Sequence, residues 1–353
     1  IALIEAEQID NEECEFIVLR ADTDDNGEDY FNTIDNEKEF NEVDNLVFCL
    51  ISYLDFSNTK INDGEYSLKT IGKEYLSKNK YQDIKKFVIA QADAYKLLEQ
   101  LIIKNRYKNL ILLDYIYNTN KDMQFSAVTF VISPKLKYIC FEGTDELLSG
   151  WKEDGQLACF FPIPSHREAI KYVNKNVKLF GPEVIIGGHS KGGNLALVSG
   201  MFMKKYKKHK VIAVYSNDGP GLRRKEFESK EYQQIKKKFI HIVPDCSMVG
   251  VALRNDCYKV IKSSKDNIYG HSMTSWCVKG DELVSSKLSD KSKRLEKSLI
   301  SWLDKHDDEE RIIIITTLFR VFEDANITTV NSAKKVGNLI KIIHNINGID
   351  KQT

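Results

Sequence analysis

The sequence predicts an α/β fold, in which a mostly parallel β-sheet is covered by helices on both faces and further helices are added at both ends. Hydrophobic residues first recur at helical spacing. Short runs rich in β-branched and aromatic residues then alternate with helical segments, and the C-terminal part returns to helical periodicity. Strands that alternate with helices indicate a parallel sheet, because each helix carries the chain back before the next strand begins.

The elements are expected in the following order. Residues 42–121 look largely helical, and a hairpin follows around the turn Ser133-Pro134, with strands at 125–132 and 137–141. Helices are then expected at 168–179, 191–206 and 225–235, alternating with strands at 183–186, 211–215, 239–243 and 258–261. Further helices are expected at 289–305, 308–324 and 331–346. The expected organisation is an acidic segment at 1–37, an α/β core with an N-terminal helical part at 38–285, and a helical extension at 286–353.

Composition limits the possible partners. The 51 basic and 51 acidic residues cancel, which gives no general electrostatic reason to bind nucleic acid. No apolar run approaches the roughly 20 residues of a membrane span, so no transmembrane segment is expected. The seven cysteines are scattered and never spaced as C-x-x-C, which predicts reduced thiols, no metal site and a cytoplasmic protein. The sequence does not indicate an oligomeric state.

The most informative segment runs from Glu183 to Val198 and holds Gly188-His-Ser-Lys-Gly192, a match to G-x-S-x-G. An apolar strand is expected before this motif and a helix after it, which is the setting of a nucleophile elbow in the α/β-hydrolase fold. The turn is so tight that glycine is needed two residues to either side of the serine. Ser190 is therefore the predicted nucleophile. Phosphate- and dinucleotide-binding loops are excluded, because neither G-x-x-x-x-G-K-[ST] nor G-x-G-x-x-G occurs here.

A serine nucleophile needs a base and an orienting acid, which follow it in the order Ser, Asp or Glu, His. Asp245 comes directly after the second strand beyond the elbow and is the predicted acid. Asp218 comes after the first such strand and is the alternative, although Asp-Gly-Pro-Gly also suits a turn that lines the pocket. His271 follows the next strand and a polar loop, so it is the predicted base.

Acyl transfer also needs donors aimed at the oxyanion of the tetrahedral intermediate. The backbone N–H of Lys191, the residue after the nucleophile, is one predicted donor. Thr144 is the other, through its N–H and its hydroxyl, because Glu142-Gly-Thr-Asp145 follows a strand that precedes the elbow. No cofactor or metal is expected.

Together these pieces resemble the fungal-type (class 3) triacylglycerol lipases, in which Gly-His-Ser-Leu-Gly-Gly follows Phe-Arg-Gly-(Ser/Thr) and a tryptophan. The matching stretches are Gly188–Gly193, Phe141–Thr144 with Trp151 beyond it, and His271 with Trp276 five residues later. The resemblance implies that Ser190, Asp245 and His271 form the triad and that Thr144 and Lys191 are the oxyanion donors. Lys191 replaces the usual leucine, and Glu142 replaces the lipase arginine.

A longer stretch, roughly 38–345, is similar to an uncharacterised bacterial family of lipase-like α/β-hydrolases. The features that carry this likeness include Asn41-Glu-Val-Asp-Asn-Leu, Ser52-Tyr-Leu-Asp-Phe and Asn217-Asp-Gly-Pro-Gly. The expected function is thus a serine hydrolase of small-molecule or lipid carboxylic esters. Two alternatives stay open: a hydrolase of another acyl bond, such as an amide or thioester, and a catalytically silent binding protein. Residues 156–164 suit either a lid or a loop packed on the core.

Overall fold

The computed structural model describes residues 39–84, 89–120, 123–144 and 148–324. Eight of the described strands form one sheet in which spatial order follows chain order, from β1 to β8. Strands β1 to β4 pair antiparallel, and β4 to β8 pair parallel. The strands are β1 (Tyr66–Ser67), β2 (Ile111–Asn120), β3 (Met123–Ser133), β4 (Leu136–Phe141), β5 (Glu183–His189), β6 (Val211–Asn217), β7 (Phe239–Pro244) and β8 (Lys259–Ile261), with a separate pair β9 (Val278–Lys279) and β10 (Glu282–Leu283).

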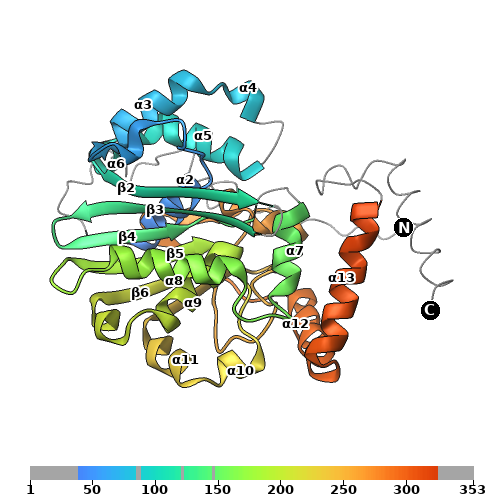
Figure 1. The fold of residues 1–353 in the computed structure, drawn as a ribbon. Helices are drawn as coiled ribbons and strands as arrows, with labels where there is room; N and C mark the ends of the chain where they lie inside the picture. The colour runs from blue at the N-terminus through green and yellow to red at the C-terminus, as the bar shows by residue number, and fades with distance from the viewer. Residues whose placement is uncertain (1–38, 85–88, 121–122, 145–147, 325–353) are drawn as a thin grey trace.

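Helices cover both faces of this sheet, as expected (Figure 1). The α-helices are α2 (Glu42–Ile51), α3 (Leu68–Lys78), α4 (Tyr81–Ile84), α5 (Ile89–Leu101), α6 (Asn105–Lys108), α7 (Leu148–Gln156), α8 (Pro164–Asn176), α9 (Lys191–Phe202), α10 (Arg224–Phe227), α11 (Lys230–Ile235), α12 (Asp290–Lys305) and α13 (Asp308–Asp324). Short 3₁₀ helices are η1 (Lys60–Asn62), η2 (Lys205–Lys210), η3 (Lys236–Lys238), η4 (Asn267–His271) and η5 (Met273–Ser275).

Successive strand residues point to opposite faces, so the sheet separates two apolar cores. On one face, Phe130 and Tyr138 of the sheet pack with buried residues of α2, α3 and α5. On the other face, Ile139 and Phe141 pack with buried residues of α8, α9 and α11. The strands between them are buried on both sides, which explains the continuous apolar run of β5.

The main difference from the expected elements lies at residues 111–120, which were expected to continue the helical region and instead form β2. This stretch pairs with β3 along its length, apart from a register shift between Leu113 and Ile116. It is rich in isoleucine and tyrosine, residue types that suit a strand once a partner is present. The helix expected at 225–235 is split into α10 and α11, because the Ser229 side chain accepts the N–H of Tyr232 and starts a new helix. The expected segment 1–37 and the expected helix 331–346 lie outside the described residues.

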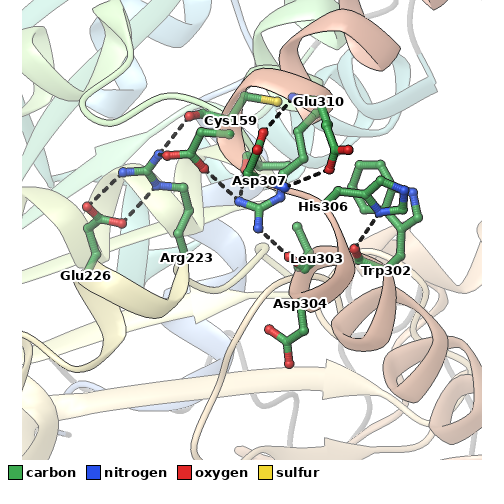
Figure 2. Close-up of polar contacts among 12 residues, drawn as sticks. Cys159, Arg223, Glu226, Trp302, Leu303, Asp304, His306, Asp307 and Glu310 are labelled. Atoms are coloured by element: carbon green, nitrogen blue, oxygen red, sulfur yellow. Dashed lines mark hydrogen bonds and ion pairs between the residues drawn. The ribbon is translucent and has the colours of Figure 1, made fainter.

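The C-terminal helices α12 and α13 dock against one end of the core, beside α7 (Figure 1). Two arginines, one before α10 and one in α13, donate to carbonyls of the loop that follows α7. Arg223, which precedes α10, donates to the Cys159 carbonyl at 2.7 Å, and this contact is drawn in Figure 2. Arg311 of α13 donates to the neighbouring Ala158 carbonyl at 3.3 Å. Segments distant in sequence therefore meet at the carbonyls of one loop.

This loop belongs to residues 156–164, for which a lid or a packed loop was expected. Leu157, Cys159 and Ile163 are buried, and Leu157 and Ile163 form a small apolar cluster with Leu303 of α12. The structure thus agrees with the packed loop.

Two expectations concern the whole chain. None of the helices in the described ranges is both long and apolar enough to cross a membrane. Among the described cysteines, Cys49, Cys140, Cys159, Cys246 and Cys257 are free, whereas Cys277 is disulfide-bonded. The expectation of reduced thiols throughout is therefore wrong at Cys277.

Candidate active site

Ser190 lies at the junction of β5 and α9 with backbone angles of φ 56° and ψ −130°. A side-chain-bearing residue rarely adopts positive φ, and such strained residues concentrate at functional sites. Two backbone hydrogen bonds hold Ser190 in this conformation. The Ser190 N–H donates to the Asn217 carbonyl at 3.0 Å, and the Ser190 carbonyl accepts from the Gly193 N–H at 2.9 Å. The serine is 8% exposed.

The two flanking glycines are required by close backbone contact. A Cβ at position 188 would lie 2.3 Å from the Gly192 carbonyl oxygen, and one at position 192 would lie 2.2 Å from the Phe141 carbonyl oxygen. Both distances are far below van der Waals contact. The strand, strained serine and helix, set in a mostly parallel sheet, make this an α/β-hydrolase fold with a nucleophile elbow.

His271 ends η4, in the loop after β8, and its partner is Asp218. The His271 Nδ1 atom lies 2.6 Å from Asp218 Oδ2. Asp218 is fully buried, and its other carboxylate oxygen accepts from Ser247 Oγ and from the Gly250 N–H. Burial alone would raise the pKa of Asp218. The hydrogen bond and charge of His271, together with the hydrogen bond from the Ser247 hydroxyl, hold that pKa below its ordinary value.

The structure does not bring Asp245 to His271. Asp245 Oδ2 accepts from Ser286 Oγ at 2.9 Å, and the Asp245 carbonyl accepts from the N–H of Ser289, the residue that caps α12. Burial raises the pKa of this carboxyl group. Asp245 thus joins the end of β7 to the C-terminal helices, and the carboxylate that contacts His271 is that of Asp218, the alternative acid.

Sheet register gives the physical reason why Asp218, and not Asp245, reaches His271. His189 of β5 pairs with Asn217 of β6, so the next residues, Ser190 and Asp218, leave adjacent strands side by side. Asp245 follows β7, one strand further away, and neighbouring strands lie about 4.8 Å apart. Asp218 also has a positive φ of 47°, and a Cβ on its neighbour Gly219 would lie 2.6 Å from the Ser190 carbonyl. The Asp218 turn therefore packs directly on the elbow.

Neither Ser190 Oγ nor His271 Nε2 hydrogen-bonds to another residue in the described part of the chain. The two residues are nevertheless joined through His189, which precedes the serine. His189 Nε2 lies 2.8 Å from the His271 carbonyl oxygen, and the two imidazole rings are 4.4 Å apart. The His271 loop is further held by Trp276, whose Nε1 donates to the Gly270 carbonyl at 2.9 Å.

The predicted oxyanion segment lies against the elbow. A Cβ at Gly143 would lie 3.1 Å from Ser190 Cβ and 2.7 Å from the His189 carbonyl oxygen, so Thr144 follows a residue in contact with the serine. The Thr144 hydroxyl donates to Asp154 Oδ2 at 2.7 Å. Lys191 is the first residue of α9, where a backbone N–H has no acceptor within the helix. The backbone N–H groups of these two residues therefore remain the candidate donors, while the Thr144 hydroxyl is already occupied.

Sequence reasoning missed the acidic residues of α7. Lys191 Nζ lies 3.0 Å from Glu153 Oε2 and donates to the Gln124 carbonyl, and both charged side chains are 1% exposed. Glu153 Oε1 accepts from Ser165 Oγ at 2.6 Å. The buried charge beside Ser190 is thereby neutralised. A lysine in the elbow where an apolar residue is usual was the only signal in the sequence. The side chain of Trp151, on the same helix, lies outside the described part.

Asp154 gives this site a predicted pH dependence. Burial, only partly offset by Lys191 and the Thr144 hydroxyl, raises its pKa from 3.8 to about 6. The folded protein thus binds the carboxyl proton of Asp154 more tightly than the unfolded chain does. This proton binding contributes stability that is fully present below pH 3.8 and is lost as the pH rises through about 6. We expect Asp154→Asn to unfold at a higher urea concentration than the wild type at pH 8, with the difference disappearing near pH 4. A difference that is constant with pH would contradict this assignment.

Comparison with known proteins places the chain in a family. The family model described as Mbeg1-like matches residues 101–320, which is more than half of the chain. The chain belongs to the Mbeg1-like family. The match begins at the end of α5 and includes the elbow, Asp218 and His271. No curated protein matches this Mbeg1-like chain significantly.

Two solved structures are similar to the Mbeg1-like chain. One is a fungal lipase in complex with an inhibitor, described as a model for interfacial activation in lipases; it is 16% identical, with a TM-score of 0.32, over 45% of this chain and 62% of that one. The other is M37 lipase, which is 14% identical, with a TM-score of 0.35, over 61% of this chain and 70% of that one. The chain thus spans less than two thirds of the fungal lipase. Its assignment to the fold rests on its own sheet and elbow.

Among the described residues, no group of three or more His, Cys, Asp or Glu side chains is arranged to hold a metal ion.

Proposed function

We propose that this Mbeg1-like protein is a serine hydrolase that cleaves carboxylic esters of small molecules or lipids, with Ser190 as nucleophile, His271 as base and Asp218 as acid. The observation that carries the proposal is the strained backbone of Ser190, at φ 56° between β5 and α9. Such strain persists only where the surroundings enforce it, and it presents the hydroxyl group at the edge of the sheet. The contact between the buried Asp218 carboxylate and the partly exposed His271 supports the assignment.

In this mechanism Ser190 Oγ attacks the carbonyl carbon of the ester while His271 Nε2 takes the hydroxyl proton. The carboxylate of Asp218 accepts from Nδ1–H, which fixes the tautomer and stabilises the imidazolium that forms. The backbone N–H groups of Lys191 and Thr144 donate to the oxyanion. Collapse of the tetrahedral intermediate expels the alcohol, which takes the proton from His271. Water then attacks the acyl-enzyme, releases the carboxylic acid and restores Ser190.

Covalent labelling by a fluorophosphonate tests the proposal. We expect the wild-type protein to be labelled, and labelling to be lost in Ser190→Ala and in His271→Ala, because the phosphorus atom is attacked only by an activated serine. Ser77→Ala, in which an exposed helical serine is changed, is the matched control and should be labelled like the wild type. A folded wild-type protein that is not labelled would show the proposal to be wrong.

One observation favours a second candidate, a catalytically silent protein that binds rather than cleaves. Ser190 Oγ and His271 Nε2 make no hydrogen bond with each other, and the serine is buried. The labelling experiment separates the candidates, since a silent fold retains Ser190 but does not activate it. Labelling without turnover of a graded series of nitrophenyl esters would instead point to another acyl bond.

A further inference from the structure

The imidazole of His189 lies between three segments of the candidate site. Its Nδ1 atom is 2.7 Å from the Tyr53 hydroxyl, beyond the end of α2, and its Nε2 atom is 2.8 Å from the His271 carbonyl oxygen. Its own backbone belongs to β5, immediately before Ser190. Both Tyr53 and His189 are buried, at 2% and 5% exposure. The proposed mechanism uses neither side chain.

The positions of the protons in these two hydrogen bonds follow from the pKa of His189 and from the chemistry of its two partners. Burial and the neighbouring His271 lower the pKa of His189 to about 3, so its ring is neutral at ordinary pH and carries a single N–H. A backbone carbonyl can only accept, and therefore the hydrogen must sit on Nε2. Nδ1 is then an acceptor, and the Tyr53 hydroxyl must donate to it. Burial raises the pKa of Tyr53 well above its ordinary value, so the hydroxyl keeps its proton.

The same hydroxyl touches the oxyanion segment. A Cβ at position 143 would lie 2.1 Å from Tyr53 Oη, so the tyrosine packs on Gly143 as well as on His189. One buried side chain thus contacts the segment before Thr144 and, through His189, the backbone of the predicted base.

We propose that Tyr53 and His189 are positioning residues, which hold the His271 loop over Ser190 through the bonds Tyr53 Oη–H to His189 Nδ1 and His189 Nε2–H to the His271 carbonyl. This inference rests on the proposed function. His189 can fill this role in one tautomer only, because only the form with a hydrogen on Nε2 can donate to the His271 carbonyl. The His271 side chain is 21% exposed, so a fixed backbone carbonyl limits the movement of the base.

Two substitutions of His189 separate the two bonds. In His189→Gln the amide nitrogen can take the place of Nε2 and still donate to the His271 carbonyl, whereas the acceptor for Tyr53 is displaced. In His189→Asn the amide oxygen can take the place of Nδ1 and still accept from Tyr53, but no donor reaches His271. Each variant loses the imidazole ring and one hydrogen bond, so the two are matched in their expected effect on stability.

The measurement is kcat and KM for p-nitrophenyl acetate, together with Tm from thermal unfolding. We expect kcat to fall about 100-fold in His189→Asn with KM little changed, since small displacements of a catalytic group can cost about this much. In His189→Gln we expect kcat to stay within about 10-fold of the wild type. Similar Tm values with these unequal kcat values would support the proposal.

Equal losses of kcat in both variants at similar Tm would overturn the positioning role, and so would full activity in His189→Asn. These results differ from failure of the proposed function, in which the wild type itself would neither react with the fluorophosphonate nor turn over the ester. Tyr53→Phe gives a further check, because it keeps the aromatic ring but removes the donor. A kcat unchanged from the wild type in Tyr53→Phe would remove Tyr53 from the proposal.

Discussion

We expect Asp218→Asn to slow the reaction of Ser190 with a fluorophosphonate by about 10⁴-fold, the loss found when the acid of a serine-protease triad is made an amide. The carboxylate of Asp218 can only accept, so it holds a hydrogen on His271 Nδ1 and leaves Nε2 free to take the serine proton. An asparagine amide can donate to Nδ1 instead, which would place the hydrogen on Nε2 and disable the base. The measurement is the second-order rate constant for labelling.

Asp245→Asn is the matched control, because it makes the same chemical change at the other predicted acid. We expect it to keep the labelling rate of the wild type within a few-fold, since Asp245 contacts Ser286 and the start of α12 rather than His271. The reverse result, with loss in Asp245→Asn and none in Asp218→Asn, would show that Asp245 is the acid. Circular dichroism would confirm that both variants are folded.

The second large effect is expected on stability, at the Lys191–Glu153 pair. Lys191→Met removes one partner and leaves the buried Glu153 carboxylate with uncharged hydrogen-bond donors from Ser165 and Gln124. Breaking a buried ion pair in this way costs about 3–5 kcal/mol of unfolding free energy, because the remaining charge is not compensated. The midpoint of urea unfolding at pH 7 measures the change.

Two further variants test whether the missing charge causes this loss. Lys191→Met combined with Glu153→Gln removes both charges, and we expect it to recover a large part of the stability. Lys171→Met breaks the exposed Lys171–Glu168 pair on α8 and should change the unfolding free energy by about 0.5 kcal/mol or less. If Lys191→Met were as mild as Lys171→Met, the buried pair would not stabilise the fold in the way proposed.

Local sequence determined the elbow. Gly188 and Gly192 fit because a Cβ at either position would strike backbone atoms of Gly192 or Phe141, and a short apolar strand followed by helical periodicity places Ser190 between them. These constraints act within a few residues of the serine, so they can be recognised from the sequence alone. The helical pattern, in contrast, predicts helix at 111–120, where pairing with β3 instead makes a strand.

The proposed partners of Ser190 depend on the tertiary structure. Asp218 and Asp245 both follow strands and both suit a turn, and only the lateral order and register of β5, β6 and β7 place Asp218 beside the elbow. Similarly, Tyr53 meets His189 across 136 residues of sequence, and Glu153 meets Lys191 across 38. The sequence itself determined the strained serine and its glycines, because that geometry is local. The proposed acid, the buried counter-ion and the tautomer of His189 depend on which segments the folded sheet brings side by side.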